Sequence, residues 1–330
     1  MQKHNKELRI IVFPRLHLTL IGMNEHGYRI NGGIGFSIQA PQLFLIIKPS
    51  DSFQFIDNRY TQLSQNQREK LAQIIEKVRS QYQFKYSISV KISGEMRTHY
   101  GFGSETSIRL SCLEALFILN ERQYESELII SLSGRGGTSG IGIHTYFEGG
   151  AVLDIGRKYD GDPFNPSTYA ENRKKVALLL QRVPMPEWNI GLCIPLEISP
   201  KNEFEEKEFF EKTCPITDTQ VHETLYHVIF GLNAAIQEHD KLTFCKALKN
   251  IQNCAWKYAE RKQYGIKLSE LETNLYSSGA LAVGMSSLGP SLFFIADDIP
   301  NVINRMQSCA SKCQLINTYS VNMGRTIKYA

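Results

Sequence analysis

The sequence predicts an α+β protein built from two lobes. Its 330 residues are 42% hydrophobic, enough for one large or two modest globular units with a buried core. Short β-rich segments dominate the first third of the chain, and helical periodicity dominates the second half. Strands and helices do not alternate regularly, so a single parallel βαβα array is not expected. Prolines at 184, 186 and 195 separate the two parts, and we predict lobes at 1–187 and 188–330.

The first lobe is expected to combine strands with two helices. The strand-like segments are 9–13, 18–21, 35–39, 43–48 and 84–92. Ser64 and Gln67 form a capping-box pattern, and apolar residues recur at helical spacing from there to Tyr82, which indicates a surface helix on a sheet. A second helix is expected from Ser104 to Leu119.

The second lobe is expected to be mainly helical. Its helical segments are 204–212, 221–232, 242–260 and 300–312, and its strand-like segments are 188–195, 292–296 and 315–321. Cys309 and Cys313 share the apolar face of the last helix, which favours buried packing over metal binding. His222 and Glu223 begin like a zinc-protease helix, but Tyr226 stands where the second histidine should be, so we interpret His222 and His227 as capping or surface residues.

Charge and cysteine usage limit the classes of partner. The net charge of +4 favours small anionic ligands over a nucleic-acid groove. Apolar runs are far shorter than the roughly 18 residues of a membrane span, and the polar start argues against a secretory signal. The seven cysteines are an odd number with no C-x-x-C, which fits reduced thiols. We therefore expect a cytoplasmic protein that binds neither nucleic acid nor membranes.

Glycine-rich segments are the most informative feature of the sequence. One is 31–35, which contains Gly32 and Gly33; another, the helix-start turn (residues 100–106), runs into the helix predicted from Ser104. A helix start offers unpaired N–H groups and a positive dipole end, which suit phosphate. An ordinary turn or helix cap is the alternative, because a lone G-x-G-S is a weak signal.

Two further segments have the same character. The arginine loop (residues 133–142) interleaves five glycines with Arg135, Thr138 and Ser139, a composition that could wrap a polyanion. A flexible hairpin is the alternative, although a hairpin needs only one or two glycines. The serine turn (residues 284–290) contains Gly284, Ser286 and Ser287 before a predicted strand. A P-loop motif and a G-x-S-x-G nucleophile elbow are both absent.

Taken in order, these segments resemble the β-ribofuranosylaminobenzene 5′-phosphate synthase family of the GHMP kinase superfamily. The resemblance is carried by P-R-L-H at 14–17, G-G-I-G at 32–35, G-F-G-S at 101–104, G-R-G-G-T-S-G-I-G at 134–142, R-V-P-M-P-E-W at 182–188 and G-M-S-S-L-G-P at 284–290. It spans most of the chain, and the segments at 134–142 and 284–290 are the most specific.

The resemblance implies a two-lobed GHMP-kinase-like fold and a transferase. Members of the family join phosphoribosyl pyrophosphate to 4-hydroxybenzoate or 4-aminobenzoate and release CO2 and pyrophosphate, early in methanopterin-type cofactor synthesis. The family requires Mg²⁺, and the resemblance favours a homodimer. Two alternatives remain open: an ATP-dependent small-molecule kinase of the same superfamily, and a non-catalytic ligand-binding relative.

Candidate site residues follow from the chemistry that pyrophosphate departure and an oxocarbenium-like ribosyl centre require. The catalytic candidates are Asp154 for metal or cation stabilisation, Arg135 for charge neutralisation and His17 for orienting the phenol or amine. The substrate-binding candidates are Arg15 for the aryl carboxylate, together with Gly32, Gly33, Thr138, Ser139 and Gly140. The phosphate-binding candidates are Gly101, Gly103, Ser104, Thr106, Gly284, Ser286 and Ser287.

Two positions depart from the family pattern. Glu105 places a carboxylate in the helix-start turn, where it should repel phosphate unless it turns toward Mg²⁺. Residues 280–283 contain fewer glycines than the corresponding family segment. The proposal requires that 101–106, 134–142 and 284–289 line a single cleft.

Overall fold

Three β-sheets organise the chain, which is described here by a computed structural model. The model describes residues 7–25, 27–159, 161, 163–169, 176–309 and 311–329. The first sheet has the order β14-β1-β4-β6-β5, with only β5 and β6 parallel. Its strands are β1 (Leu8–Val12), β4 (Leu43–Ser50), β5 (Gln54–Asp57), β6 (Ser87–Gly94) and β14 (Thr326–Tyr329).

All strand pairs in the other two sheets are antiparallel. The second has the order β2-β3-β7-β9, and a short strand, β8, also pairs with β3. The third has the order β11-β12-β10-β13. Their strands are β2 (Arg15–Gly22), β3 (Arg29–Ser37), β7 (Ala151–Asp154), β8 (Arg157–Lys158), β9 (Leu179–Val183), β10 (Asn189–Pro195), β11 (Ala282–Met285), β12 (Leu292–Ile295) and β13 (Cys313–Tyr319).

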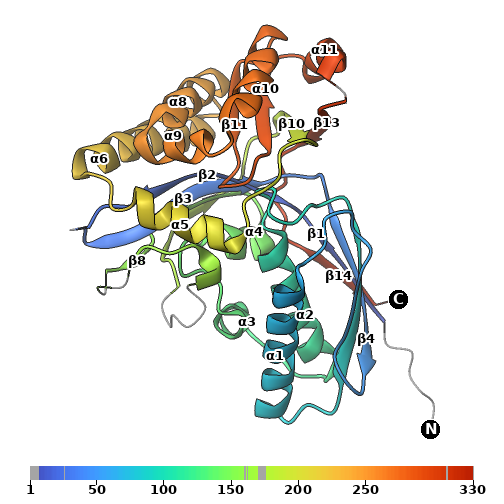
Figure 1. Cartoon of the computed structure of the whole chain (residues 1–330). Helices are drawn as coiled ribbons and strands as arrows, with labels where there is room; N and C mark the ends of the chain where they lie inside the picture. Colours follow the sequence, from blue (N-terminus) through green and yellow to red (C-terminus); the bar gives the residue numbers. More distant parts are fainter. Residues whose placement is uncertain are drawn as a thin grey trace.

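Most helices lie toward one or other end of the molecule, and α4 and α5 lie between them (Figure 1). Helices α1 and α2 lie side by side near the first sheet, whereas α8, α9 and α10 gather beside the third. The helical elements are α1 (Gln65–Gln81), α2 (Ser104–Leu119), α3 (Ser126–Ser133), α4 (Ile141–Glu148), η1 (Ser167–Tyr169), α5 (Glu203–Thr213), α6 (Asp218–Tyr226), η2 (His227–Asn233), α7 (Ala234–Glu238), α8 (Lys241–Asn253), α9 (Ala255–Lys262), α10 (Gly265–Ser277), α11 (Ile299–Arg305) and η3 (Met306–Cys309).

The predicted α+β class is confirmed, as are the two helices predicted before residue 187; α3 and α4 in the same part of the chain were not predicted. Ser64 accepts a hydrogen bond from the N–H of Gln67, and the Gln67 side chain returns to the N–H of Ser64, so the capping box is complete. Helix α2 begins at Ser104 after the left-handed Gly103, and it ends at Leu119 as predicted. Local signals were strong at both sites, because capping and apolar spacing agree there.

Several element predictions were wrong. The helix expected at 242–260 is two helices, because Cys254 adopts an extended conformation (φ −63°, ψ 148°) between α8 and α9. The helix expected at 300–312 ends at Arg305, so Cys309 lies in η3 and Cys313 begins β13. Both thiols are nevertheless buried in one apolar group, so the packing interpretation is confirmed. The strand expected at 35–39 begins at Arg29, so the glycines at 32, 33 and 35 are strand residues.

The division into lobes at 187/188 stays a prediction, but the topology adds one fact to it. Strand β14 pairs with β1 in antiparallel register, from Leu8 opposite Tyr329 to Ile11 opposite Thr326. The last strand therefore belongs to the same sheet as the first. Arg325, the residue just before β14, donates a hydrogen bond from its Nε to the buried carboxylate of Glu114 in α2 at 3.0 Å.

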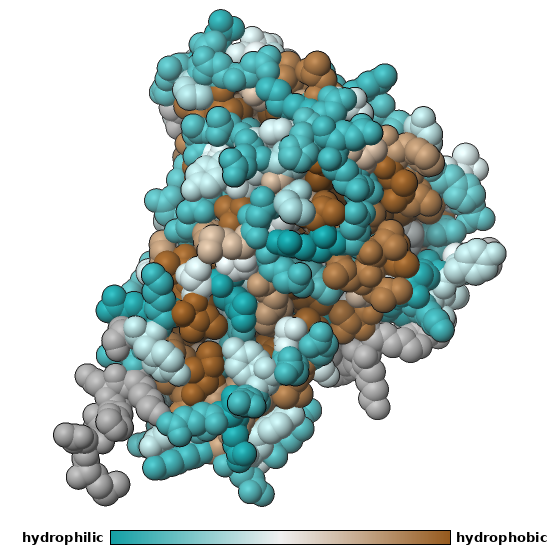
Figure 2. All heavy atoms as spheres, turned by 180° about the vertical axis from the view of Figure 1, so that it is seen from behind, coloured by the Kyte–Doolittle hydropathy of each residue, from teal (hydrophilic) through white to brown (hydrophobic). Residues whose placement is uncertain are grey.

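The principal core draws on all three sheets and on α1, α2 and α8. A separate apolar group lies where β2, α5 and α9 meet. That smaller group includes Leu20, Phe210 and Leu288, which also reach the pocket described below. On the face shown in Figure 2, hydrophobic residues gather toward the middle of the molecule, and hydrophilic residues cover much of the rest. Among the described residues, none of the helices has the length and apolarity needed to cross a bilayer.

Candidate active site

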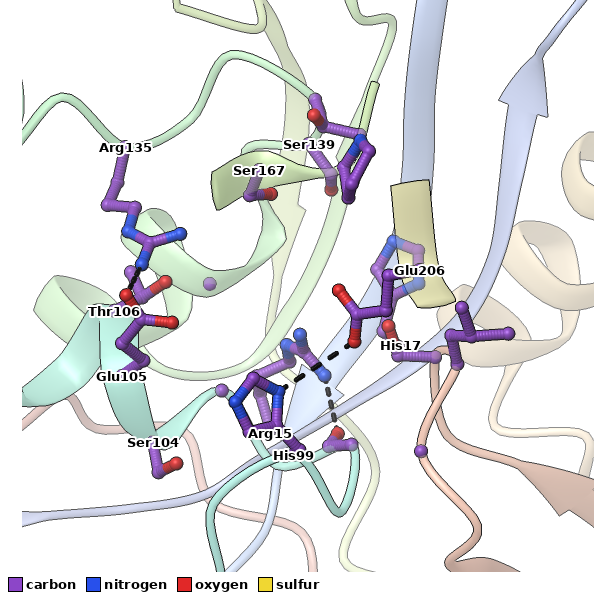
Figure 3. Close-up of a pocket in the computed structure, with 18 of the residues that line it drawn as sticks. Arg15, His17, His99, Ser104, Glu105, Thr106, Arg135, Ser139, Ser167 and Glu206 are labelled. Carbon is purple, nitrogen blue, oxygen red and sulfur yellow. Dashed lines mark hydrogen bonds and ion pairs between the residues drawn. The ribbon is translucent and has the colours of Figure 1, made fainter. Parts of the chain in front are cut away.

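Three of the four glycine-rich segments converge on one pocket, as the sequence predicted: the helix-start turn, the arginine loop and the serine turn. Its walls come from the helix-start turn, the arginine loop, the serine turn, β2, α5 and α9. Ten of the predicted site residues line it, and Figure 3 shows several of them facing a common space. They are Arg15, His17, Gly101, Gly103, Ser104, Thr106, Arg135, Thr138, Ser139 and Ser287.

The helix-start turn is held by direct backbone packing. Gly101 and Gly103 have φ values of 87° and 80°, which glycine adopts without strain. A Cβ atom on Gly101 would collide with the Ser286 carbonyl, and one on Gly289 would collide with the backbone at Gly101. The Gly101 carbonyl accepts hydrogen bonds from Ser286 Oγ at 2.7 Å and from Arg15 Nη1 at 2.5 Å. The serine turn therefore fixes the position of the helix-start turn.

This geometry leaves unpaired N–H groups at the start of α2, which is therefore a candidate anion site. The N–H groups of Ser104, Glu105 and Thr106 belong to the first turn of the helix, where no intrahelical acceptor exists. The first of these residues is buried and the other two are partly exposed, and all three line the pocket. Because the helix dipole is positive at this end, a phosphate there is favoured by both charge and hydrogen bonding.

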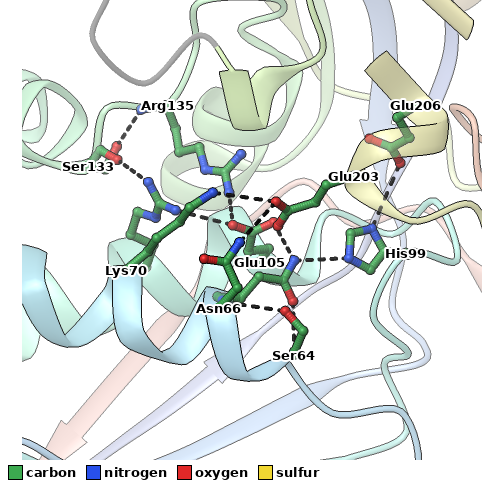
Figure 4. A network of polar contacts seen from close by, with 11 residues as sticks. Ser64, Asn66, Lys70, His99, Glu105, Ser133, Arg135, Glu203 and Glu206 are labelled. Atoms are coloured by element: carbon green, nitrogen blue, oxygen red, sulfur yellow. Dashed lines mark hydrogen bonds and ion pairs between the residues drawn. The ribbon is translucent and has the colours of Figure 1, made fainter. Parts of the chain in front are cut away.

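Glu105 does not present a free charge to that anion. Its carboxylate forms ion pairs with Arg109 at 3.2 Å and with Arg135, and it accepts a hydrogen bond from Gln67 Nε2 at 3.1 Å (Figure 4). Burial acts to raise the pKa of Glu105, but Arg135, Arg109 and His99 outweigh it, so the pKa is lowered. The negative charge of Glu105 is thus compensated by two guanidinium groups.

Arg135 is therefore partly committed to the protein. The sequence predicted a free guanidinium fork for phosphate, whereas the structure pairs one end of the fork with Glu105. The Arg135 Nε atom is buried and has no partner among the described residues. The side chain lines the pocket, so its remaining donors stay available to an anion.

Arg15 is the cation of the pocket that has no carboxylate partner within ion-pair distance among the described residues. Its Nε is buried without a hydrogen-bond partner there, and Gly103 lies so close that a Cβ would be 3.3 Å from Arg15 Cγ. Burial, opposed by Glu206 and Glu260, lowers the pKa of Arg15 to about 10. The group is still charged at neutral pH, so it is a buried cation that an anionic ligand would pair.

His17 lies beside Arg15 on β2 and is neutral. Burial, followed by the charges of Arg15 and Lys257, holds the pKa of His17 well below its ordinary value. Both ring nitrogens are buried and lack partners among the described residues. A neutral imidazole offers one donor and one acceptor, so it can orient a hydroxyl or amine group.

Asp154 lies behind the arginine loop and does not line the pocket. One carboxylate oxygen accepts hydrogen bonds from Gly140 N at 2.9 Å and Ser139 Oγ at 3.1 Å, and the other accepts from Gly156 N at 2.9 Å. The residue has no solvent exposure. Burial, opposed by these hydrogen bonds, raises the pKa of Asp154 to about 6. The position is that of a loop anchor, and direct contact with a ribosyl cation has no support from this geometry.

The other predicted residues outside the pocket lining also act through packing. A Cβ on Gly32 would meet the backbone of residues 154–156 at 2.8 to 3.0 Å, and one on Gly33 would lie 2.7 Å from His17 Nε2. Gly284 is packed against Phe293, and Ser286 accepts a hydrogen bond from the N–H of His17 at 3.1 Å. Gly140 precedes α4 and donates to Asp154. These residues do not line the pocket, but they pack against or hydrogen-bond to the segments that do.

The sequence did not predict the pocket-lining side chains that come from α5, α9 and the turn before α2. Glu206 and Phe210 come from α5, Glu260 from α9, and His99 from the turn before α2. Lys257, fully buried, pairs with Glu260 at 2.7 Å and donates to the Ser287 carbonyl at 3.2 Å. Charged residues spaced three apart on a helix usually mark a solvated face, so the sequence held no signal that these point inward.

Oxygen donors among these side chains suit a hard divalent cation. Glu206 makes only a 3.8 Å contact with His99 Nδ1, and Figures 3 and 4 show that side chain reaching toward the histidine. Burial acts to lower the pKa of His99, but Glu206, Glu105 and Glu203 outweigh it and raise the pKa. Mg²⁺ is commonly held by one or two carboxylates together with substrate phosphates, so Glu206 is a suitable ligand.

Comparisons with known proteins extend these observations. No protein-family model matches the chain. The chain is 31% identical to the β-ribofuranosylphenol 5′-phosphate synthase of Archaeoglobus fulgidus, over 97% of this chain and 99% of that protein. It is 26% identical to the protein of the same name from Methanothermobacter thermautotrophicus, over 96% and 98% of the two chains.

Solved structures with the same fold include kinases and decarboxylases. A homoserine kinase from Cytophaga hutchinsonii superposes with a TM-score of 0.70 at 14% identity, covering 99% of both chains. A mevalonate diphosphate decarboxylase from Staphylococcus aureus superposes with a TM-score of 0.65 at 13% identity, also covering 99% of both. At such identities the likeness concerns the fold alone.

Proposed function

The chain belongs to the β-ribofuranosylphenol 5′-phosphate synthase family, and from that premise we propose that its pocket joins phosphoribosyl pyrophosphate to 4-hydroxybenzoate or 4-aminobenzoate. It is an enzyme, a C-riboside synthase with the GHMP kinase fold that the sequence predicted. The observation that carries the proposal is the meeting of three glycine-rich segments around the buried pair Arg15 and His17.

The reaction forms one bond and breaks two. The ring carbon that bears the carboxylate attacks C1′ of the ribosyl group, and the C1′–O bond to pyrophosphate breaks with its electrons leaving on pyrophosphate. The aryl–carboxylate bond then breaks, CO2 departs, and that electron pair restores the aromatic ring. Carbon, phosphate and charge are balanced without an oxidant or reductant.

Each part of the pocket suits one part of this reaction. The N–H groups at the start of α2 and the free donors of Arg135 suit the phosphates, because they stabilise negative charge that grows as pyrophosphate leaves. Arg15 suits the aryl carboxylate, because a buried guanidinium pairs with a planar carboxylate through two hydrogen bonds. Neutral His17 suits the phenol or amine, whose proton it can accept and return.

We include Mg²⁺ in the proposal, with Glu206 as its protein ligand. When bound with the pyrophosphate, the ion supplies charge neutralisation to the leaving group. Glu260 is already paired with Lys257, and Glu105 with two arginines, so Glu206 is the lining carboxylate with the weakest protein partner among the described residues.

The test is direct turnover. Purified protein with Mg²⁺, phosphoribosyl pyrophosphate and 4-hydroxybenzoate should release CO2 and pyrophosphate in equal amounts. The same assay with 4-aminobenzoate identifies the acceptor. No release with either acid would refute the proposal.

The kinase alternative shares the fold, and the likeness to a homoserine kinase at 14% identity does not distinguish the two activities. A kinase should consume ATP with an alcohol substrate, and ATP should raise the thermal midpoint more than phosphoribosyl pyrophosphate does. The non-catalytic alternative was motivated by repulsion from Glu105. The two arginines that pair with Glu105 remove that reason.

A further inference from the structure

A second group of reactive side chains lies outside the active-site pocket. Glu223 comes from α6, His227 is the first residue of η2, and Cys254 is the residue that separates α8 from α9. A carboxylate oxygen, an imidazole nitrogen and the Cys254 sulfur all lie within 4.8 Å of one another. None of the three residues lines the active-site pocket.

The fold brings these residues together in two steps. Glu223 and His227 are four positions apart, so continuous helical backbone through the end of α6 places them on one face. The chain then forms a π-helical segment, η2, a rare geometry that is frequent at functional sites. Cys254 reaches the same place because its extended backbone breaks the helix that the sequence predicted at 242–260.

We propose that Glu223, His227 and Cys254 bind a divalent transition-metal ion, with Zn²⁺ as the best match. Thiolate, imidazole and carboxylate are the three ligand types that Zn²⁺ takes in proteins, and three protein ligands leave a fourth position for water. Thiolate is a poor ligand for Mg²⁺, so this site is distinct in chemistry from a Mg²⁺ site in the pocket.

Burial around the site is graded in a way that suits ion entry. Cys254 is buried, His227 is half-buried and Glu223 is exposed, so an ion would arrive from solvent at the carboxylate end. The Cys254 thiol lies 3.5 Å from the Asn250 carbonyl, a weak contact for it to lose. On binding, the ion would replace the thiol proton, which passes to solvent.

The site lies at the start of a helix that serves the pocket. Cys254 is the N-cap of α9, and the first two turns of α9 supply Lys257 and Glu260. Lys257 holds the Ser287 carbonyl, and Glu260 lines the pocket. An ion at Cys254 would therefore tie the first turn of α9 to η2 and steady those two side chains.

Cobalt titration of the full chain tests the proposal, because Co²⁺ bound to a thiolate absorbs in the near ultraviolet and visible. After treatment with a chelator, the wild type should bind one equivalent of Co²⁺ with this spectrum. Zn²⁺ should displace it, and an excess of Mg²⁺ should not. Cys254→Ser should abolish the thiolate band.

Glu223→Gln and His227→Ala should each weaken Co²⁺ binding by at least about 10- to 100-fold, the loss typical of even outer-shell changes at metal sites. Two matched controls should bind as the wild type does: His222→Ala, on the same helix, and Cys214→Ser, a half-buried thiol outside the group.

Absence of a thiolate band in the wild type, or its persistence in Cys254→Ser, would overturn the proposal. Equal losses in His222→Ala and His227→Ala would overturn it as well. Because Glu223 is exposed, Glu223→Gln should keep the circular dichroism of the wild type, so unchanged Co²⁺ affinity in that variant alone also refutes the site.

Discussion

Two glycine-rich stretches that look alike in sequence have different structural roles in this molecule. The stretch at 31–35 lies inside β3, where missing side chains let backbone and the His17 ring approach closely. The helix-start turn instead leaves helical N–H groups facing a pocket. The difference lies in what surrounds each glycine: strand neighbours on both sides in one case, the open start of a helix in the other.

The comparison teaches that a cluster of glycines indicates a place where another group packs closely against the backbone. It does not show whether that group belongs to the protein or to a ligand. In β3 the approaching group is protein, as at Gly35, where a Cβ would meet the Leu16 carbonyl and the Ile141 side chain. At the helix-start turn, Ser286 packs against one side of Gly101, and the turn also lines the pocket. Substitutions can separate the two roles.

The largest effect is expected at Arg15, the cation against which the helix-start turn packs. Arg15→Ala should lower kcat/KM by about 100- to 1000-fold, because the acceptor carboxylate loses its buried guanidinium partner. Arg15→Lys should recover part of the loss, since it keeps the charge without the planar fork. Steady-state kinetics with Arg9→Ala, an exposed arginine on β1, provides the control. Equal kcat/KM in Arg15→Ala and Arg9→Ala would contradict this role.

The packing role of the β3 glycines is tested by Gly35→Ala. The added methyl group would lie 2.7 Å from Ile141 Cγ2 and would press on the Leu16 carbonyl, so backbone must shift. We expect the free energy of unfolding to fall by about 3 kcal/mol or more, as for severe overpacking. Urea denaturation measures it. A loss below about 0.5 kcal/mol would show that β3 adapts easily.

A third test concerns Asp154, which lies in a strand paired with β3 and anchors the arginine loop of the pocket. Its pKa is raised to about 6 in the fold from an ordinary 3.8, so the folded state binds the proton more tightly than the unfolded chain does. The free energy of unfolding should therefore fall as pH rises from about 4 to 6, by up to about 3 kcal/mol.

Asp154→Asn should remove this contribution. Denaturation at pH 4, 5 and 6 should show a steeper decline for the wild type than for the variant. Parallel curves would mean that Asp154 does not titrate in this range.

The smallest effect on stability is expected at Gly142, a pocket residue in α4. A Cβ there would make ordinary contacts, the nearest being Thr106 Cγ2 at 3.7 Å. Gly142→Ala should keep or raise the free energy of unfolding by up to about 1 kcal/mol through helix propensity. The methyl group would narrow the pocket, so KM for the ribosyl donor should rise. A large stability loss, as in Gly35→Ala, would show that this pocket glycine tolerates a methyl group no better than the glycines of β3 do.

The sequence was sufficient where local signals agreed. The capping box of α1 and the start of α2 were predictable from residues in succession. The convergence of three glycine-rich segments on one pocket was expected from the family resemblance that those segments carry together. The break at Cys254 was not, because nothing in its neighbours opposes a continuous helix and tertiary packing decides it. The pairing of Glu105 with Arg135 was also hidden, since it joins residues 30 positions apart.

The sequence predicted which residues lie at or near the pocket better than it predicted what their side chains do there. Asp154 and Ser286 are close to the pocket, but their side chains bond to backbone and so act through the loops they hold. A sequence shows which residue types are present near a site. Whether a carboxylate faces ligand or loop amides depends on its orientation, which only packing fixes.

The pairing of β14 with β1 has a consequence for handling the protein. Without residues 326–329, β1 would present an open row of N–H and C=O groups along the margin of the first sheet. Exposed margins of this kind recruit strands from other molecules and promote aggregation. Shortened versions of the chain that stop before Thr326 should therefore be less soluble, whatever their effect on catalysis.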